Sequence, residues 1–232
     1  MNDKIIEILW TGGFDSTFRM CQLSKENVII QPYYIISCRK STDNEVKAIK
    51  TIFNKLINND NTIAKILPVE YISINSITPY ENIIKAYNYI TKDNYLGSQY
   101  AWLSSFAINH QGIELSIEKD TIPIKLIDKL GCLSKTNHLF DEVYVVDNNK
   151  SSNEIIDLFG SYTFPLANYS KLDMMSMYKE MGFSDIINDT WFCHNPINNE
   201  ACGCCNPCIG TIKAGLDFRF SKEAIDRFVK CL

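Results

Sequence analysis

The sequence has no apolar run that approaches the roughly 18 residues needed to cross a bilayer, and it has no basic tract. The first absence excludes a predicted transmembrane helix. The second, with 23 basic residues, 27 acidic residues and a net charge of −4, argues against direct nucleic-acid binding over a large surface. An early acid, and no cleavage site after the first apolar run, argue against a signal peptide. We therefore expect a cytoplasmic protein that makes no membrane contact, with its nine cysteines present as thiols and metal ligands and not as disulfides.

Internal repeats, low-complexity segments and linkers are also absent, so the 232 residues fit one α/β domain spanning residues 1–232. Apolar, β-rich runs predict five strands, at residues 4–9, 28–36, 63–72, 113–117 and 143–146. Helical spacing predicts helices at residues 17–24, 43–57, 83–90, 98–108, 170–181 and 224–231, and residues 124–133 are ambiguous. Strands that alternate with helices predict a five-stranded parallel sheet with helices on both faces, and Pro68 should limit the third strand. Ligands of such sheets bind beyond the carboxyl ends of the strands.

The segment KIIEILWTGGFDST, residues 4–17, places a tight glycine turn directly after the first predicted strand. Gly12 and Gly13 allow the backbone to turn sharply and to approach an anion closely. The amides that follow lie at a helix N-terminus, where unpaired N–H groups favour negative charge. The pattern therefore predicts a phosphate-binding loop.

The side chains of this loop refine the prediction. Asp15 would repel a bare phosphate, so its presence indicates either a bound Mg²⁺ or a role in ordering the loop. Hydroxyl groups that can donate to phosphate are those of Thr11, Ser16 and Thr17. The alternative is a glycine turn that joins a strand to a helix capped by Asp15 or Ser16.

Neither of the two commonest nucleotide signatures is present, because the loop lacks both a Gly-Lys-Ser/Thr ending and a G-x-G-x-x-G pattern. The sequence T-G-G-F-D-S-T instead resembles the S-G-G-x-D-S-T signature of the PP-loop ATP pyrophosphatases, with Thr11 in place of the usual serine. That family cleaves ATP between the α and β phosphates and transfers AMP to its substrate.

Five of the nine cysteines fall in residues 193–208, CHNPINNEACGCCNPC. Cys202, Cys205 and Cys208 have C-x₂-C-x₂-C spacing, and Cys193 can loop back as a fourth ligand. Four thiolates suit a closed, tetrahedral Zn²⁺ site that would hold the C-terminal segment at about residues 189–210 together. An iron–sulfur cluster and a set of free surface thiols are the alternatives. Cys204 would then face away as the odd thiol.

With both ends considered, the chain resembles the 7-cyano-7-deazaguanine synthase (QueC-like) family of PP-loop enzymes. That family pairs the N-terminal loop with a C-terminal T-x-x-C…C-G-x-C-x-x-C zinc site, which matches Thr190 to Cys193 and Cys202 to Cys208. A Pro-Leu pair at Pro165 and a lysine at Lys171 follow in the family's order. The likeness spans nearly the whole chain.

The departures from the family concern the loops that face the substrate. Gly97-Ser98-Gln99 stands where the family has a G-R-N loop, and residues 37–40 replace a Tyr-Gly-Gln segment, with Glu45 in the place of its acid. We find no acidic, glycine-containing substrate loop near residues 118–121. The sequence therefore predicts a divergent member whose ATP loop and metal site are intact.

The resemblance implies that the protein adenylates the carboxylate of 7-carboxy-7-deazaguanine, with ATP, Mg²⁺ and Zn²⁺ bound. It implies ATP contacts from Trp10, Thr11, Gly12, Gly13, Phe14, Asp15, Ser16, Thr17, Arg39 and Gly97. The catalytic residues that it implies are Asp15, Ser16 and Lys171, where Lys171 would be a second cation on phosphate or a solvated lysine. Arg19 lies on the same helix as the loop and would face phosphate or solvent. The metal ligands would be Cys193, Cys202, Cys205 and Cys208.

The acceptor of the activated acid is left open by the sequence. In the family, ammonia gives an amide and a second ATP drives dehydration to the nitrile. Relatives found near antiviral defence genes suggest a ligase that stops at the amide and joins the acid to a protein amine, which is the outcome we favour. A non-catalytic nucleotide-binding module, a sulfur-inserting enzyme acting on tRNA and a homodimeric assembly are further hypotheses.

Overall fold

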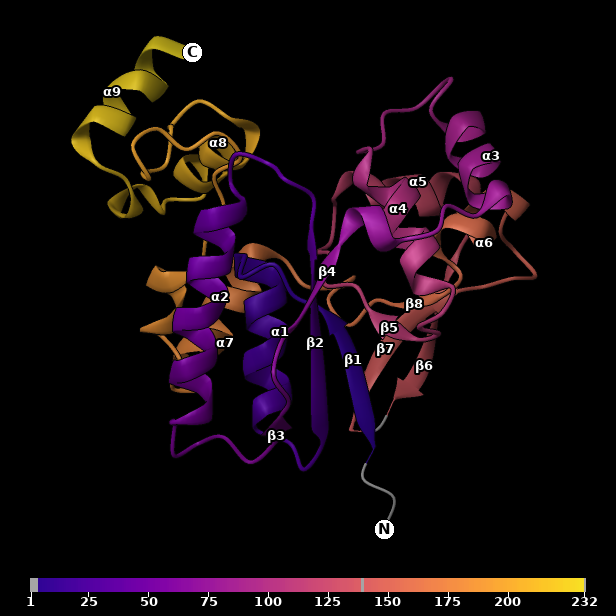
Figure 1. Cartoon of the computed structure of the whole chain (residues 1–232), viewed down its shortest axis with the longest axis horizontal. Coiled ribbons are helices and arrows are strands. Elements are labelled where there is room, and N and C mark those ends of the chain that lie inside the picture. The colour runs from indigo at the N-terminus through magenta and orange to yellow at the C-terminus, as the bar shows by residue number, and fades with distance from the viewer. Residues whose placement is uncertain (1–3, 139, 232) are drawn as a thin grey trace.

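The computed structural model describes residues 4–138 and 140–231, and its centre is a parallel sheet with six strands in five positions (Figure 1). From one edge to the other the positions hold β3 (Lys65–Ile66) with β4 (Glu70–Ser73), β2 (Ile29–Ile36), β1 (Ile5–Leu9), β5 (Ile113–Glu114) and β8 (Tyr162–Thr163). The predicted α/β class and five-position parallel sheet are confirmed. The carboxyl ends of β1 and β2 meet at one edge, where the glycine turn follows β1.

Two details of the predicted sheet are corrected. The third strand is split into β3 and β4 around Pro68, which has no N–H to donate to β2. The strand expected at residues 143–146 is β7 (Asp141–Val146), and it does not join the main sheet. It pairs antiparallel with β6 (Leu133–His138) as a separate hairpin, and the two-residue β8 takes the fifth position instead. The apolar run specified a strand but carried no information about its partner.

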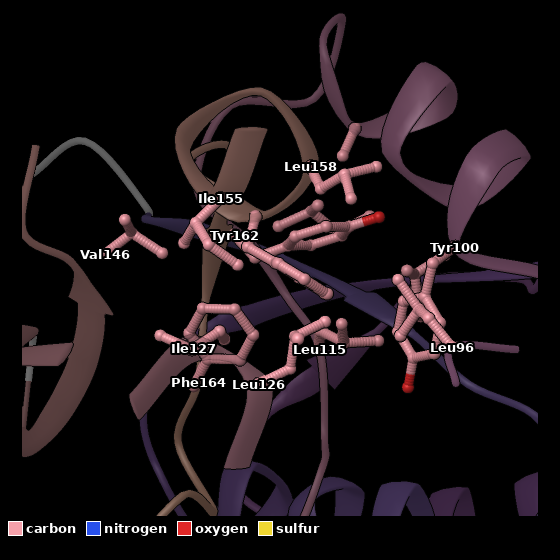
Figure 2. Packing of buried hydrophobic residues seen from close by; sticks show 14 of the residues in the cluster. Leu96, Tyr100, Leu115, Leu126, Ile127, Val146, Ile155, Leu158, Tyr162 and Phe164 are labelled. Atoms are coloured by element: carbon pink, nitrogen blue, oxygen red, sulfur yellow. The ribbon is translucent and has the colours of Figure 1, made fainter. Parts of the chain in front are cut away.

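Helices cover both faces of the sheet (Figure 1). One face packs against α1 (Phe14–Ser24), α2 (Thr42–Ile57) and α7 (Lys171–Glu180). The other face packs against α3 (Glu81–Ile90), α4 (Gln99–Ala107), α5 (Ile122–Leu130) and α6 (Asn153–Phe159). Successive side chains of a strand point to opposite faces, so Tyr34 belongs to the first core and Tyr33 to the second. Figure 2 shows the second core, where Tyr162 and Phe164 lie among aliphatic side chains.

The C-terminal lobe lies beyond the N-terminal end of α2 (Figure 1). It contains α8 (Asn206–Lys213), α9 (Lys222–Cys231) and the short 3₁₀ turn η3 (Asp217–Arg219). Two further 3₁₀ turns lie outside it: η1 (Ile74–Ser76) follows β4, and η2 (Ile186–Asp189) packs into the core beside α2. In the part of the chain that the structure describes, no helix combines the length and the apolar character needed to span a bilayer.

Arg19 faces neither phosphate nor solvent, contrary to both expectations. It is 1% exposed, and its guanidinium donates to both carboxylate oxygens of Glu114, at 2.8 and 2.7 Å, in the buried end of β5. It also pairs with Asp141 at the start of β7. The Glu114 carboxylate, against the cost of burial, helps to raise the pKa of Arg19 above its usual value, so the residue stays cationic. Arg19 therefore ties α1 to the sheet and to the hairpin.

We expect Glu114→Gln to lower the free energy of unfolding by about 3 kcal/mol, because it leaves a buried guanidinium without its bidentate partner. Urea denaturation measures this change. Glu81→Gln is the matched control, since it removes the exposed pair with Lys85 and should cost less than about 0.5 kcal/mol. Equal losses in the two variants would contradict a structural role for the buried pair.

Candidate functional site

Buried side chains hold the turn between β1 and α1 in place. Trp10 is fully buried, and its indole N–H donates to the Thr17 hydroxyl at 3.0 Å, so Thr17 supports the turn from inside the protein. Gly12 has φ +68°, and a Cβ at this position would lie 3.1 Å from the Ile49 backbone nitrogen. Gly13 precedes the first residue of α1, so the first amides of the helix have no partner within the helix. The turn thus presents free N–H groups at a helix N-terminus, as an anion site requires.

Gly12→Ala should destabilise the protein by about 2 kcal/mol, because it adds a crowded Cβ to a left-handed backbone. Thermal unfolding should then fall by about 4–8 °C. Gly112→Ala is the control for backbone strain alone, since Gly112 has φ +84° with nothing within 4 Å of the added Cβ. A Gly12→Ala loss no larger than that of the control would show that α2 does not crowd the turn.

A cavity of about 210 Å³ opens over this turn. Most of the predicted loop residues line it, together with the ends of β2 and β5 and the start of α4. The lining residues are Leu9, Trp10, Thr11, Gly13, Phe14, Asp15, Ser16, Tyr33, Ile35, Arg39, Gln99, Tyr100, Trp102, Leu103, Leu115, Ser116 and Ile117. The structure therefore brings Arg39 to the loop, whereas Gly97 is not among the lining residues and Gln99 takes its place. The walls are largely aromatic and aliphatic, as is typical of pockets for flat organic rings.

Arg39 is held at the cavity by an acid that follows it in sequence. Its guanidinium donates to Glu45 at 3.0 Å, and Glu45 also accepts from Tyr34 at 2.7 Å and from Ser41 at 2.6 Å. Glu45 is only 6% exposed. The acid therefore orients the arginine and does not itself face the cavity.

Asp15 and Lys171, the two charged residues to which the resemblance gave catalytic roles, lie together at the edge of the loop. Lys171 Nζ is 3.9 Å from Asp15 Oδ1 and forms an ion pair with Glu118, an acid that the sequence reasoning had not assigned. Burial would lower the pKa of Lys171, but the carboxylates of Asp15 and Glu118 outweigh it and raise that pKa. Lys171 is thus a fixed cation next to the loop.

The Asp15 carboxylate is suited to bind a cation in addition to Lys171. Its side chain is 29% exposed, yet Oδ1 is shielded from solvent and accepts no hydrogen bond within the described residues. Burial raises the pKa of Asp15 to about 6, although Lys171 opposes the change. An oxygen ligand of this kind suits Mg²⁺, so the residues present fit the ion expected with ATP.

The cysteine cluster assembles as the spacing predicted. The sulfur atoms of Cys193, Cys202, Cys205 and Cys208 all lie within 4.8 Å of one another. Individual separations are 3.4 Å for Cys205–Cys208, 3.8 Å for Cys202–Cys208 and 3.9 Å for Cys193–Cys205. A tetrahedral Zn²⁺ with bonds of about 2.3 Å places its sulfur ligands about 3.8 Å apart. The set therefore fits one zinc ion, and free thiols in an open surface loop would not converge in this way.

Backbone N–H groups support the cluster. The amide of Cys202 donates to the Cys193 sulfur at 3.2 Å, and the amide of Cys205 donates to the Cys202 sulfur at 3.3 Å. His194 is exposed beside the cluster, as expected of a surface residue.

Cys204 corrects the expectation of free thiols throughout. It forms a disulfide with Cys231, the last residue of α9, with a Cα–Cα separation of 6.0 Å. Gly203, at φ +83°, packs so closely on α9 that a Cβ would lie 2.1 Å from the Ala224 carbonyl oxygen. This contact turns Cys204 away from the metal ligands and toward the helix.

Three residues around the candidate site were missed in whole or in part from the sequence. Glu118 was given no role, because no acidic, glycine-containing loop was found near residues 118–121, and its contact with Lys171 depends on the meeting of two distant segments. Gln99 was seen only as a departure from the G-R-N pattern, yet it lines the cavity. Glu45 was matched to an acid of the family, but no contact was predicted for it. In the structure it accepts hydrogen bonds from Arg39 and Tyr34.

Two comparisons with known proteins bear on this site. A family model described as queuosine biosynthesis protein QueC matches residues 5–216, which include both the glycine turn and the cysteine cluster. A search of the curated proteins found no match to the chain.

Proposed function

The chain belongs to the QueC family, a family of queuosine biosynthesis proteins, and from this premise we propose that it is an ATP-dependent ligase. It activates the carboxylate of 7-carboxy-7-deazaguanine as an acyl-adenylate and couples it to an amine, with release of AMP and pyrophosphate. The product that we favour is an amide, formed on an amine of a partner protein in an antiviral defence system. The nitrile made from ammonia, for queuosine-type tRNA modification, is the alternative product.

The observation that carries this proposal is Asp15 Oδ1 at the N-terminus of α1, which accepts no hydrogen bond from the described residues and lies 3.9 Å from Lys171 Nζ. Free amides and a fixed cation stabilise the negative charge that develops on departing pyrophosphate. Mg²⁺, when bound by Asp15, would neutralise part of the phosphate charge. Ser16, whose hydroxyl lies 3.3 Å from that of Thr11, adds a donor on the same turn.

Each step follows from the need for a leaving group. A carboxylate resists attack by an amine, and adenylation replaces its poor leaving group with AMP. The carboxylate oxygen attacks the α-phosphorus, and the bond from that phosphorus to the bridging oxygen of pyrophosphate breaks. Arg39 lies at the cavity next to the turn, where it can hold an anionic part of either ligand.

Departures from the family in the loops around the cavity favour the amide. Residues 37–40 and the Gly97-Ser98-Gln99 turn differ from the family pattern. Glu118 forms an ion pair with Lys171. Dehydration of the amide to a nitrile requires that the amide be held for a second activation, and these are the loops that would hold it.

Mass spectrometry of the products from ATP, Mg²⁺ and 7-carboxy-7-deazaguanine tests the proposal, with ammonia and candidate proteins offered in parallel. We expect AMP, pyrophosphate and an amide product. A nitrile as the final product would support the alternative. ATP binding without AMP formation, whichever amine is supplied, would show a non-catalytic nucleotide-binding module.

A further inference from the structure

A second cavity, of about 510 Å³, lies in the C-terminal lobe. Its walls come from residues 188–192, from the hairpin at residues 199–201 and from the turn at residues 218–221. It shares no lining residue with the cavity over the glycine turn. The proposed ligase needs a place for its amine, and this volume is far larger than ammonia requires but suits a larger organic ligand.

One wall of this cavity offers a cation with no counter-charge. Arg219 donates to the Thr190 carbonyl and hydroxyl oxygens, and its guanidinium lies 4.6 Å from the centre of the Phe192 ring. No carboxylate of the described residues is within ion-pair distance of it. Burial lowers the pKa of Arg219 to about 10, although Tyr178 and the carboxylate of Asp189 oppose the change. A ligand carboxylate or carbonyl would compensate the buried charge.

The opposite charge lies on a hairpin that is fixed in place. Glu200 lines the cavity and pairs through its backbone with Ile197, so that Asn198 and Asn199, both at positive φ, form a two-residue turn. The Asn44 side chain at the start of α2 donates to the Asn199 carbonyl at 3.3 Å. Across the described residues Glu200 makes no ion pair either. The cavity thus offers one free charge of each sign.

Aromatic side chains form the apolar part of the cavity. Phe218 is 66% exposed, and Trp191 and Phe192 stack at a centroid separation of 6.2 Å. Trp191 also connects this cavity to the ATP loop, because its backbone N–H donates to the Gly12 carbonyl at 2.8 Å. A wall of this cavity is therefore hydrogen-bonded directly to the glycine turn.

We propose that this second cavity receives the end of a peptide that carries the acceptor amine. The inference rests on the proposed ligase function and specifies its second substrate. Arg219 binds a peptide carbonyl or carboxylate, the exposed Phe218 ring covers an apolar side chain, and Glu200 attracts the amino group while it is protonated. In the coupling step the neutral amine nitrogen bonds to the acyl carbon. The bond from that carbon to the AMP oxygen breaks, AMP leaves with the electron pair, and a nitrogen proton passes to solvent.

The test offers ammonia and the dipeptide Ala-Leu together to the full-length protein with ATP, Mg²⁺ and 7-carboxy-7-deazaguanine. We expect wild-type protein to join the acid to both amines. Arg219→Gln and Phe218→Ala should each lower the ratio of dipeptide product to ammonia product about tenfold. Lys222→Gln, an exposed charge outside the cavity, is the matched control and should keep the wild-type ratio.

Calorimetric binding of Ala-Leu without ATP gives an independent readout, and its dissociation constant should rise about tenfold in Arg219→Gln. Because Phe218 is exposed, its replacement tests the cavity in a folded protein. A wild-type product ratio in both variants, or ammonia product without dipeptide product, would overturn the inference while leaving the ligase function intact. Binding of Ala-Leu at this cavity without AMP formation would support the site and overturn the ligase.

Discussion

Replacing Asp15 with asparagine is expected to reduce ATP cleavage about 10²–10³-fold while making the protein more stable at neutral pH. Activity falls because the neutral amide lacks the negative charge that would hold Mg²⁺ next to the phosphates. Stability rises because the Asp15 carboxylate is ionised at a cost in the native state, where burial raises its pKa from 3.8 to about 6. Asparagine removes that cost and keeps the shape of the side chain. Such opposing effects are typical of a functional group that the fold does not need.

The stability difference should depend on pH with a defined sign. A raised carboxylate pKa contributes stability that is present below the unfolded pKa of 3.8 and is lost as the pH rises through about 6. The two proteins should therefore be equally stable near pH 4, and the variant should gain on the order of 1–2 kcal/mol above pH 6, after allowance for partial exposure.

Thermal unfolding between pH 4 and pH 8, with pyrophosphate release measured on the same samples, checks both effects. Asp60→Asn is the matched control, since Asp60 is exposed and forms no ion pair in the described chain. Asp60→Asn should change neither the unfolding temperature nor the rate of pyrophosphate release. Retained ATP cleavage in Asp15→Asn would refute the assignment of the active site, whatever happened to its stability.

Local sequence determined the parts of the site that depend on nearby residues. The glycine turn follows from the strand before it and the helix after it, and the four metal ligands lie within 16 residues, from Cys193 to Cys208. Short spacing leaves few ways for such groups to meet. For this reason the loop and the cluster were predictable without knowledge of the tertiary fold.

Contacts between distant segments were not predictable in the same way. Arg19 meets Glu114 across 95 residues, and nothing near Arg19 in sequence distinguishes a buried ion pair from a phosphate contact. The hairpin of β6 and β7 shows the same limit, because an apolar run does not specify which strand it pairs with. The disulfide of Cys204 depends on the docking of α9, which brings together cysteines 27 residues apart.

Replacing Cys205 with serine should release the metal and unfold much of the C-terminal lobe, which is the largest loss of structure that we expect from one substitution. The sulfur atoms of Cys205 and of the three other ligands are buried or half-buried, and they lie too close together to remain as thiolates without a cation. Apart from the disulfide of Cys204 and Cys231, the lobe depends on a small hydrophobic cluster. Its buried members are Ala201 and three of the metal ligands, Cys193, Cys202 and Cys208. Metal binding is therefore coupled to the folding of this lobe, and structural zinc sites of this kind contribute about 10 kcal/mol or more of binding free energy.

The loss should spread to the ATP loop, because Trp191 of the lobe donates to the Gly12 carbonyl. Elemental analysis should find about one zinc per chain in the wild type and none in Cys205→Ser, and proteolysis should cleave the variant within the lobe. Cys132→Ser is the matched control, since Cys132 is a partly buried free cysteine that does not belong to the cluster. This variant should retain both its zinc and its resistance to proteolysis. If the wild-type protein contains iron and acid-labile sulfide, the cysteines hold an iron–sulfur cluster and not zinc. A wild-type protein that contains no metal and yet has an intact lobe would contradict the prediction that metal binding stabilises the lobe. The disulfide of Cys204 and Cys231 would then be the link that holds α9 to the lobe.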